Sequence, residues 1–130
     1  INNLCDNPLL IWDLIKEYKE ISWNYKRLSS NQCVTWDIIV NNISLPWNWY
    51  NIGKNPNITM EIVNNNNNYP WDFNGLSENI NITEEIMNEN NHHKWSMIRY
   101  KHYNPNEKQK LIKLYKNMTI EEIIQKHEIS

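Results

Sequence analysis

Apolar and polar positions along the chain recur with a period of 24 residues. Tryptophan occurs four times at this step, and an aliphatic residue or a tyrosine follows each tryptophan five positions later. A register that persists over most of a chain indicates a tandem-repeat protein. The recurring positions are Trp23, Trp47, Trp71 and Trp95; Leu28, Ile52, Leu76 and Tyr100; Val34, Ile58 and Ile82; and Asn7, Asn31, Asn55 and Asn79.

Each unit contains two helix-start signals. A residue with a side-chain oxygen directly follows each of these tryptophans, and another stands twelve positions after the tryptophan. Such residues cap helices, because their oxygen accepts a hydrogen bond from a backbone amide that has no partner within the helix. We predict a first helix of one to two turns, a tight turn, and a second helix of two to three turns. The recurring Asn31, Asn55 and Asn79 are expected to end the first helix in the left-handed conformation. The predicted caps are Asn24, Asn48, Asp72 and Ser96, then Thr35, Thr59 and Thr83.

Leucine-rich repeats have similar periods, and the unit from Trp47 to Asn55 fits their spacing. In the neighbouring units, however, Lys26 and Asn74 stand where a strand would need an apolar inward-facing side chain. The predicted fold class is therefore all-α: an α-solenoid of 24-residue two-helix repeats over residues 1–103, in which stacking stabilises helices too short to persist alone. At the N-terminal end of the chain, Ile11 stands at the cap position of a second helix. Isoleucine is a poor cap, so we expect this helix to be frayed or to begin differently from its equivalents.

The register degrades after Trp95, and residues 104–130 are interpreted as a modified terminal repeat, a longer helical cap. Apolar positions from 106 to 116 suit an amphipathic helix. Thr119 and Glu122 then form a capping-box signature. The same segment also resembles the first two helices of helix-turn-helix domains, but the chain ends before a base-reading third helix could form.

Composition excludes several classes of protein. Apolar residues make up 40% of the chain and the mean hydropathy is −0.77, with no apolar run near the roughly 20 residues of a membrane helix. Seven tryptophans and seven tyrosines argue against disorder, despite 25 asparagines. No secretion signal is visible at the N-terminus, so we expect a protein that is not secreted.

The residues that could carry chemistry do not form recognisable sites. The sequence has no phosphate-binding glycine loop and no nucleophile–base motif, so we predict neither an enzyme nor a cofactor. His92, His93 and His102 lack partners at zinc spacing, and no metal site is predicted. Cys5 and Cys33 are interpreted as free thiols. Four glycosylation sequons are interpreted as by-products of helix capping in an asparagine-rich chain; they begin at Asn42, Asn57, Asn81 and Asn117.

Two surfaces are candidates for binding. Tyr50, Asn51, Asn74 and Gly75 lie on first helices and vary between units, so we predict that they contact a protein partner. The segment from His92 to Lys116 carries seven Lys or Arg against one acid, which offers an alternative: binding of nucleic acid or an acidic partner. A third hypothesis is self-assembly as a structural component. The basic residues are Lys94, Arg99, Lys101, Lys108, Lys110, Lys113 and Lys116.

The units from Pro46 to Val63 and from Pro70 to Met87 resemble the asparagine-rich tandem repeats of giant DNA viruses of the mimivirus type, whose units read like PWDWxxLSxNPNITWDIV. The segment from Thr35 to Ile39 matches as well, whereas Phe73, Ile80 and Glu84 depart from the pattern. The resemblance covers residues 4–97. It implies a viral origin and a location in the host cytoplasm, at a viral factory, or in the virion. The resemblance brings no biochemical activity with it.

Overall fold

The computed structural model describes residues 5–7, 10–102, 119 and 122. Every regular element in these residues is a short helix, and they contain no strand. The helical prediction is therefore confirmed and the leucine-rich alternative is wrong. The elements are α1 (Trp12–Glu17), α2 (Tyr25–Leu28), α3 (Trp36–Asn41), α4 (Trp49–Lys54), α5 (Met60–Asn65), α6 (Phe73–Ser77), α7 (Glu84–Glu89) and α8 (Met97–His102).

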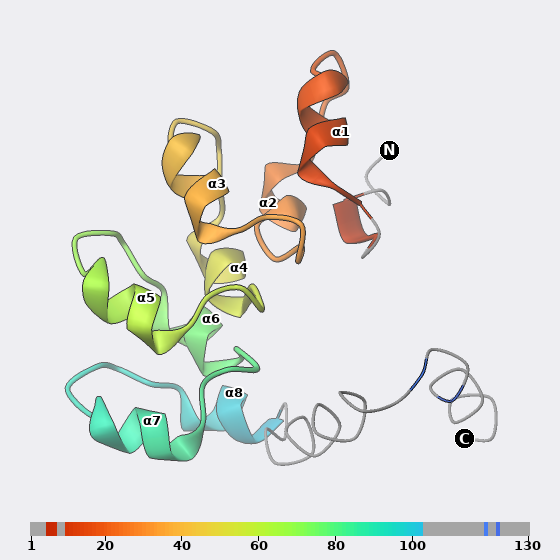
Figure 1. The fold of residues 1–130 in the computed structure, drawn as a ribbon. Helices are drawn as coiled ribbons and strands as arrows, with labels where there is room; N and C mark the ends of the chain where they lie inside the picture. Colours follow the sequence, from red (N-terminus) through yellow and green to blue (C-terminus); the bar gives the residue numbers. More distant parts are fainter. Residues whose placement is uncertain (1–4, 8–9, 103–118, 120–121, 123–130) are drawn as a thin grey trace.

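The helices form two rows (Figure 1). The first helices of the units, α2, α4, α6 and α8, follow one another along an inner row, and the second helices, α1, α3, α5 and α7, follow one another along an outer row. The predicted cap at 104–130 and its boundary at residue 103 lie almost entirely outside the described residues. Of that segment, Thr119 accepts the backbone N–H of Glu122 at 3.2 Å and donates its hydroxyl to the Glu122 carboxylate at 3.1 Å.

The predicted helix caps are confirmed. Asn24, Asn48 and Asp72 each accept hydrogen bonds from backbone amides of the first turn, as Asn48 does from Asn51 at 2.9 Å. Ser96 accepts the amide of Arg99, and each threonine accepts the amide three residues ahead. Ile11 precedes α1 without a side-chain hydrogen bond, as expected of a poor cap, but α1 begins at the position equivalent to α3, α5 and α7, so the prediction of a different start is wrong. Local side-chain chemistry therefore decides where these helices begin.

The second helices are shorter than predicted. Each of α3, α5 and α7 has six residues, which is under two turns at about 3.6 residues per turn. Asparagine ends each of these helices by donating its side-chain amide to the carbonyl four residues back, as Asn66 does to Ile62 at 2.8 Å. The backbone oxygen of the same asparagine then accepts the indole N–H of the next tryptophan, as in the 2.8 Å bond from Trp71 to Asn66. These two bonds turn the chain away from the helix.

The recurring aliphatic residues form the core. Leu28, Ile52 and Leu76 have no exposed surface, and neither do Val34, Ile58 and Ile82, one residue of each kind from each successive unit. The tryptophans lie at the edge: Trp47, Trp71 and Trp95 are half-buried against this core, and only Trp23 falls among its buried members. Aliphatic side chains therefore make the continuous apolar contact between units, and the tryptophans border it.

Three asparagines, which we call the asparagine ladder (Asn31, Asn55 and Asn79), hold consecutive units together. The Asn55 side-chain amide donates to three carbonyls of the preceding unit, at Ser29 (2.9 Å), Asn31 (3.1 Å) and Val34 (2.9 Å). Asn79 repeats these bonds on Gly53, Asn55 and Ile58 at 2.7–3.1 Å. Their own oxygens accept a backbone amide two residues ahead. Because φ of Asn55 is −63°, the predicted left-handed conformation is wrong there.

Candidate protein-binding surface

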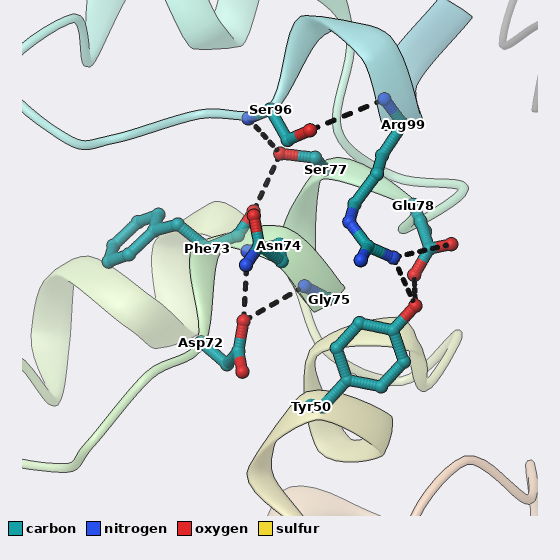
Figure 2. Close-up of polar contacts among 9 residues, drawn as sticks. All are labelled: Tyr50, Asp72, Phe73, Asn74, Gly75, Ser77, Glu78, Ser96 and Arg99. Carbon is teal, nitrogen blue, oxygen red and sulfur yellow. Dashed lines mark hydrogen bonds and ion pairs between the residues drawn. The ribbon is translucent and has the colours of Figure 1, made fainter. Parts of the chain in front are cut away.

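The structure places Tyr50, predicted to bind a partner, in a contact that joins three units. Its hydroxyl donates to the carboxylate of Glu78 and accepts from an Arg99 guanidinium nitrogen at 2.8 Å. Arg99 also lies 3.6 Å from the other oxygen of Glu78, whose side chain is only 2% exposed. Figure 2 shows Arg99 reaching from α8 past Glu78 to Tyr50 on α4. The half-buried Tyr50 thus ties α4 to the two following units.

Asn51 and Gly75 also face neighbouring units. The Asn51 side chain donates to the backbone oxygen of Lys26 at 2.9 Å. Gly75 is buried, and a Cβ built on it would overlap the carbonyl oxygen of Tyr50 and lie 2.9 Å from the carbonyl carbon. The prediction that Gly75 belongs to an exposed surface is therefore wrong, because α6 packs there backbone to backbone on α4. Asn74 is exposed and keeps its place as a candidate contact.

The predicted basic patch is only partly within the described residues. Lys94 and Lys101 are exposed, whereas Arg99 is half-buried and paired with Glu78. Lys108, Lys110, Lys113 and Lys116 lie outside the described residues. Binding of a polyanion by this patch stays a prediction.

Positions that are partly exposed and vary between units lie beside the recurring tryptophans in a row of aromatic rings, which we call the aromatic strip. In its first part, Trp36 lies 5.0 Å from Tyr69 and 5.0 Å from Trp71, and Trp49 lies 5.3 Å from Trp71, measured between ring centroids. Each of these side chains is half-buried. The strip continues along the chain through Phe73, His93 and Trp95, which are also half-buried.

Ring contacts and hydrogen bonds fix the orientation of the strip. Phe73 stacks on His93 with centroids 4.1 Å apart and meets Trp95 edge-on at 5.0 Å. The indole N–H groups of Trp71 and Trp95 are held by backbone oxygens at 2.8 Å and 2.9 Å. Burial, with a smaller contribution from neighbouring His92, lowers the pKa of His93, so this ring is neutral near pH 7. The strip therefore presents a rigid and mainly apolar surface.

Two hollows open on the strip and share Pro70, Trp71 and Phe73. The larger has a volume of about 570 Å³ and is also lined by Trp49, Asp72, Asn74 and Lys94. The smaller, of about 250 Å³, extends over Val63, Asn64, Asn67, Tyr69, His92 and His93. An aromatic ridge between two hollows can bury apolar side chains of another molecule, while Asn74 and Lys94 supply polar contacts at the edge.

The smaller hollow is a recurring product of the repeat. A third hollow, of about 300 Å³, lies near the N-terminal units. Five residues that line it stand 48 residues, or two units, before residues that line the smaller hollow. The chemistry changes between the two copies, because Lys16 and Lys19 in one correspond to Asn64 and Asn67 in the other. The five residues are Ile15, Lys16, Lys19, Tyr25 and Leu45.

The other candidate groups have structural partners. The described sequon asparagines all use their side-chain amides inside the fold: Asn42 donates to Ile38, and Asn57 and Asn81 donate to carbonyls of the preceding unit. Across the described part of the chain, no three His, Cys, Asp or Glu side chains gather at metal-binding distance. No helix there is long and apolar enough to cross a membrane.

The thiol of Cys33 is expected to be less reactive than an exposed cysteine thiol. Burial raises its pKa from 9.0 to about 11, with a smaller contribution from Cys5. Because the pKa is higher in the folded chain, Cys33 stabilises the fold at neutral pH, and this contribution is lost as pH rises from its unfolded value through about 11.

We expect Cys33 of the folded chain to react with a thiolate-specific disulfide reagent at pH 8 at least about tenfold more slowly than in the urea-unfolded chain, since the thiolate is the nucleophile. A Cys5→Ser variant isolates this thiol, and absorbance of the released reagent follows the rate. Equal rates in the two states would contradict the assignment.

Comparisons of the chain with protein-family models, curated proteins and solved structures found no match. The candidate surface therefore depends on geometry alone. Sequence reasoning selected positions that vary between units, which was a useful signal. It did not separate variable positions that face a neighbouring unit, such as Tyr50, from those that face solvent, such as Asn74.

Proposed function

We propose that this chain is a segment of an α-solenoid whose aromatic strip binds another protein, without enzymatic activity. The support for an α-solenoid is that the same contacts join successive units: the bonds of Asn55 to the unit before it recur at Asn79 with the same spacing. Such arrays offer extended surfaces built from equivalent positions of each unit.

The observation that carries the binding proposal is a contrast between positions. The ladder position is asparagine in each of these units, whereas the positions of the strip other than the recurring Trp71 and Trp95 change from unit to unit. The residue that opens the second helix is Trp12, Trp36, Met60 or Glu84, and the residue that opens the first is Tyr25, Trp49, Phe73 or Met97. The constant contacts maintain the packing of one unit on the next, and the variable, half-exposed side chains give each unit its own surface.

Aromatic side chains suit this role. Tryptophan and tyrosine dominate the residues that contribute most to protein–protein affinity, and such residues lie in pockets that exclude water. In the strip, Trp71 is already held by its indole hydrogen bond and its ring contacts, so binding would immobilise little additional side-chain freedom. We propose an apolar or aromatic segment of a protein partner as the ligand.

The resemblance to giant-virus repeats suggests where this happens. We propose a viral protein that acts in the host cytoplasm, at a viral factory, or in the virion. The alternative of nucleic-acid binding through the segment from His92 to Lys116 is less well supported, because Arg99 is paired with Glu78 and His93 is neutral near pH 7.

A selection from a peptide display library on the immobilised chain tests the binding proposal. We expect enriched peptides to carry aromatic or apolar anchors and to bind at least about tenfold more weakly to Phe73→Ala, as for a central contact residue. Asn74→Arg should weaken the same peptides by obstructing the larger hollow, without removing a buried side chain. Fluorescence anisotropy of labelled peptides measures both changes.

Gln32→Ala is the matched control, because Gln32 is exposed and lines a separate hollow with Cys5 and Pro56. The enriched peptides should bind the Gln32→Ala variant with the same affinity as they bind the unmodified chain. The proposal fails if no peptide is enriched, or if enriched peptides bind Phe73→Ala and Asn74→Arg as tightly as they bind the unmodified chain.

A further inference from the structure

Asn74 and Gly75 form the only Asn-Gly pair in the sequence. This dipeptide is the one most prone to spontaneous deamidation, because glycine leaves its own amide nitrogen open to attack the preceding side chain. Asn74 is exposed, so water reaches its side chain, whereas Gly75 is buried at the contact of α6 with α4. The two halves of the reacting pair thus lie in opposite environments.

Two contacts hold the attacking nitrogen in place. The N–H of Gly75 donates to Oδ1 of Asp72 at 3.2 Å, and the same oxygen accepts the N–H of Asn74 at 2.9 Å (Figure 2). The Cα of Gly75 lies against the backbone of Tyr50 so closely that no side chain fits between them. The nitrogen therefore has to leave the Asp72 cap, and α6 has to separate from α4, before the side chain of Asn74 can be attacked.

We propose that Asn74 is a modification site of this protein, at which deamidation by water is restrained by the Asp72 cap and released when α6 separates from α4. Solvent hydroxide removes the proton from the Gly75 nitrogen, which bonds to Cγ of Asn74. The Cγ–Nδ2 bond breaks as Nδ2 takes a proton from water, so that ammonia leaves, hydroxide is regenerated and a five-membered succinimide remains. Water then opens either carbonyl of the ring and yields aspartate or isoaspartate, with no change of oxidation state.

The product alters the contact between units. Isoaspartate routes the main chain through the former side chain and so lengthens it by one methylene immediately before Gly75. The longer main chain shifts Gly75 relative to the backbone of Tyr50, where there is no free space, so α6 cannot return to its position. Either product also adds a negative charge beside Asp72. One opening event that ends in isoaspartate would therefore become a permanent separation of two units.

The experiment follows deamidation of the full chain at pH 8 and 37 °C by peptide mass spectrometry. In the folded chain we expect Asn74 to react at least about tenfold more slowly than in the chain unfolded in urea, where it should react before every other asparagine. Asp72→Ala should raise the folded-state rate by about fivefold, which corresponds to the usual effect of removing an N-cap. Asp72→Asn keeps an oxygen acceptor and should raise the rate much less.

Asn74→Gln separates the chemistry from the fold, because glutamine would need a six-membered ring and should not react on this time scale. Circular dichroism verifies that each variant is folded. Equal rates in the folded and unfolded chains, an unchanged rate in Asp72→Ala, or earlier reaction at another asparagine of the unfolded chain would overturn the proposal. The comparison of folded with unfolded unmodified chain holds even where a variant does not fold.

Discussion

Replacing Gly75 with alanine is expected to lower the free energy of unfolding by at least about 3 kcal/mol, at the upper end of the range for overpacking a filled contact. The new methyl group would overlap the carbonyl oxygen of Tyr50, and this neighbour is backbone that cannot rotate away. Glycine-to-alanine changes inside helices ordinarily stabilise by about 0.5–1 kcal/mol, so the expected sign is opposite to the propensity. Urea unfolding followed by circular dichroism measures the change.

Two variants control this prediction. Asn74→Ala changes the adjacent exposed side chain and should alter the free energy of unfolding by less than about 0.5 kcal/mol. Gly53→Ala should destabilise less than Gly75→Ala, because the nearest atom to its added methyl, the backbone nitrogen of Leu76, is 2.8 Å away. A neutral or stabilising Gly75→Ala would show that α4 and α6 do not pack backbone to backbone.

Replacing Asn55 with alanine is expected to lower the free energy of unfolding by about 3–5 kcal/mol, because each buried polar group left without a partner costs about 1–3 kcal/mol. Asn55 has no exposed surface, and its amide donates to three carbonyls of the preceding unit, of which those of Asn31 and Val34 also accept from other donors. Its oxygen also accepts the backbone amide of Asn57 at 2.8 Å. Urea unfolding gives the free energy.

Asn55→Asp is a sharper version of the same test, since it keeps the shape and removes the donor. The ionised carboxylate would face three carbonyl oxygens, so we expect it to destabilise at least as much as alanine at pH 7. Burial would raise the pKa of this carboxyl in the folded chain. The penalty is therefore full above that raised pKa and is relieved as pH falls through it.

Asn57→Ala is the matched control for the ladder, because Asn57 is half-buried and bonds only two carbonyls of the preceding unit. It should destabilise by about 1–2 kcal/mol. If Asn55→Ala costs no more than Asn57→Ala, or if Asn55→Asp shows no recovery toward acidic pH, the ladder does not hold the units together.

The two predictions concern two successive interfaces between units. Gly75 allows two helices to approach, and Asn55 bonds the turns that follow the helices. The contact of Tyr50, Glu78 and Arg99 adds a third link, which spans three units. A loss of stability from any of these sites is expected to affect the aromatic strip, because its rings come from several consecutive units.

Local signals in the sequence were sufficient for the helix starts. A cap such as Thr59 and the amide that it binds lie three residues apart, so the sequence contains the whole interaction. The aliphatic core was equally accessible, because burial of Ile52 and Leu76 follows from their period and their apolar character. The lengths of the second helices could not be predicted in this way. Their ends depend on hydrogen bonds of a terminal asparagine, one of which comes from a tryptophan beyond the helix.

The sequence by itself determined the helical class, the register of 24 residues and the capping of each helix, because these depend on residues within about one turn of each other. Only the tertiary structure decided what faces a neighbour. Asparagine is usually exposed, so nothing in the chain marks Asn55 as buried until the carbonyls of the preceding unit are placed around it. The same holds for Tyr50 and Arg99, whose contact spans 49 residues and depends on which units lie side by side.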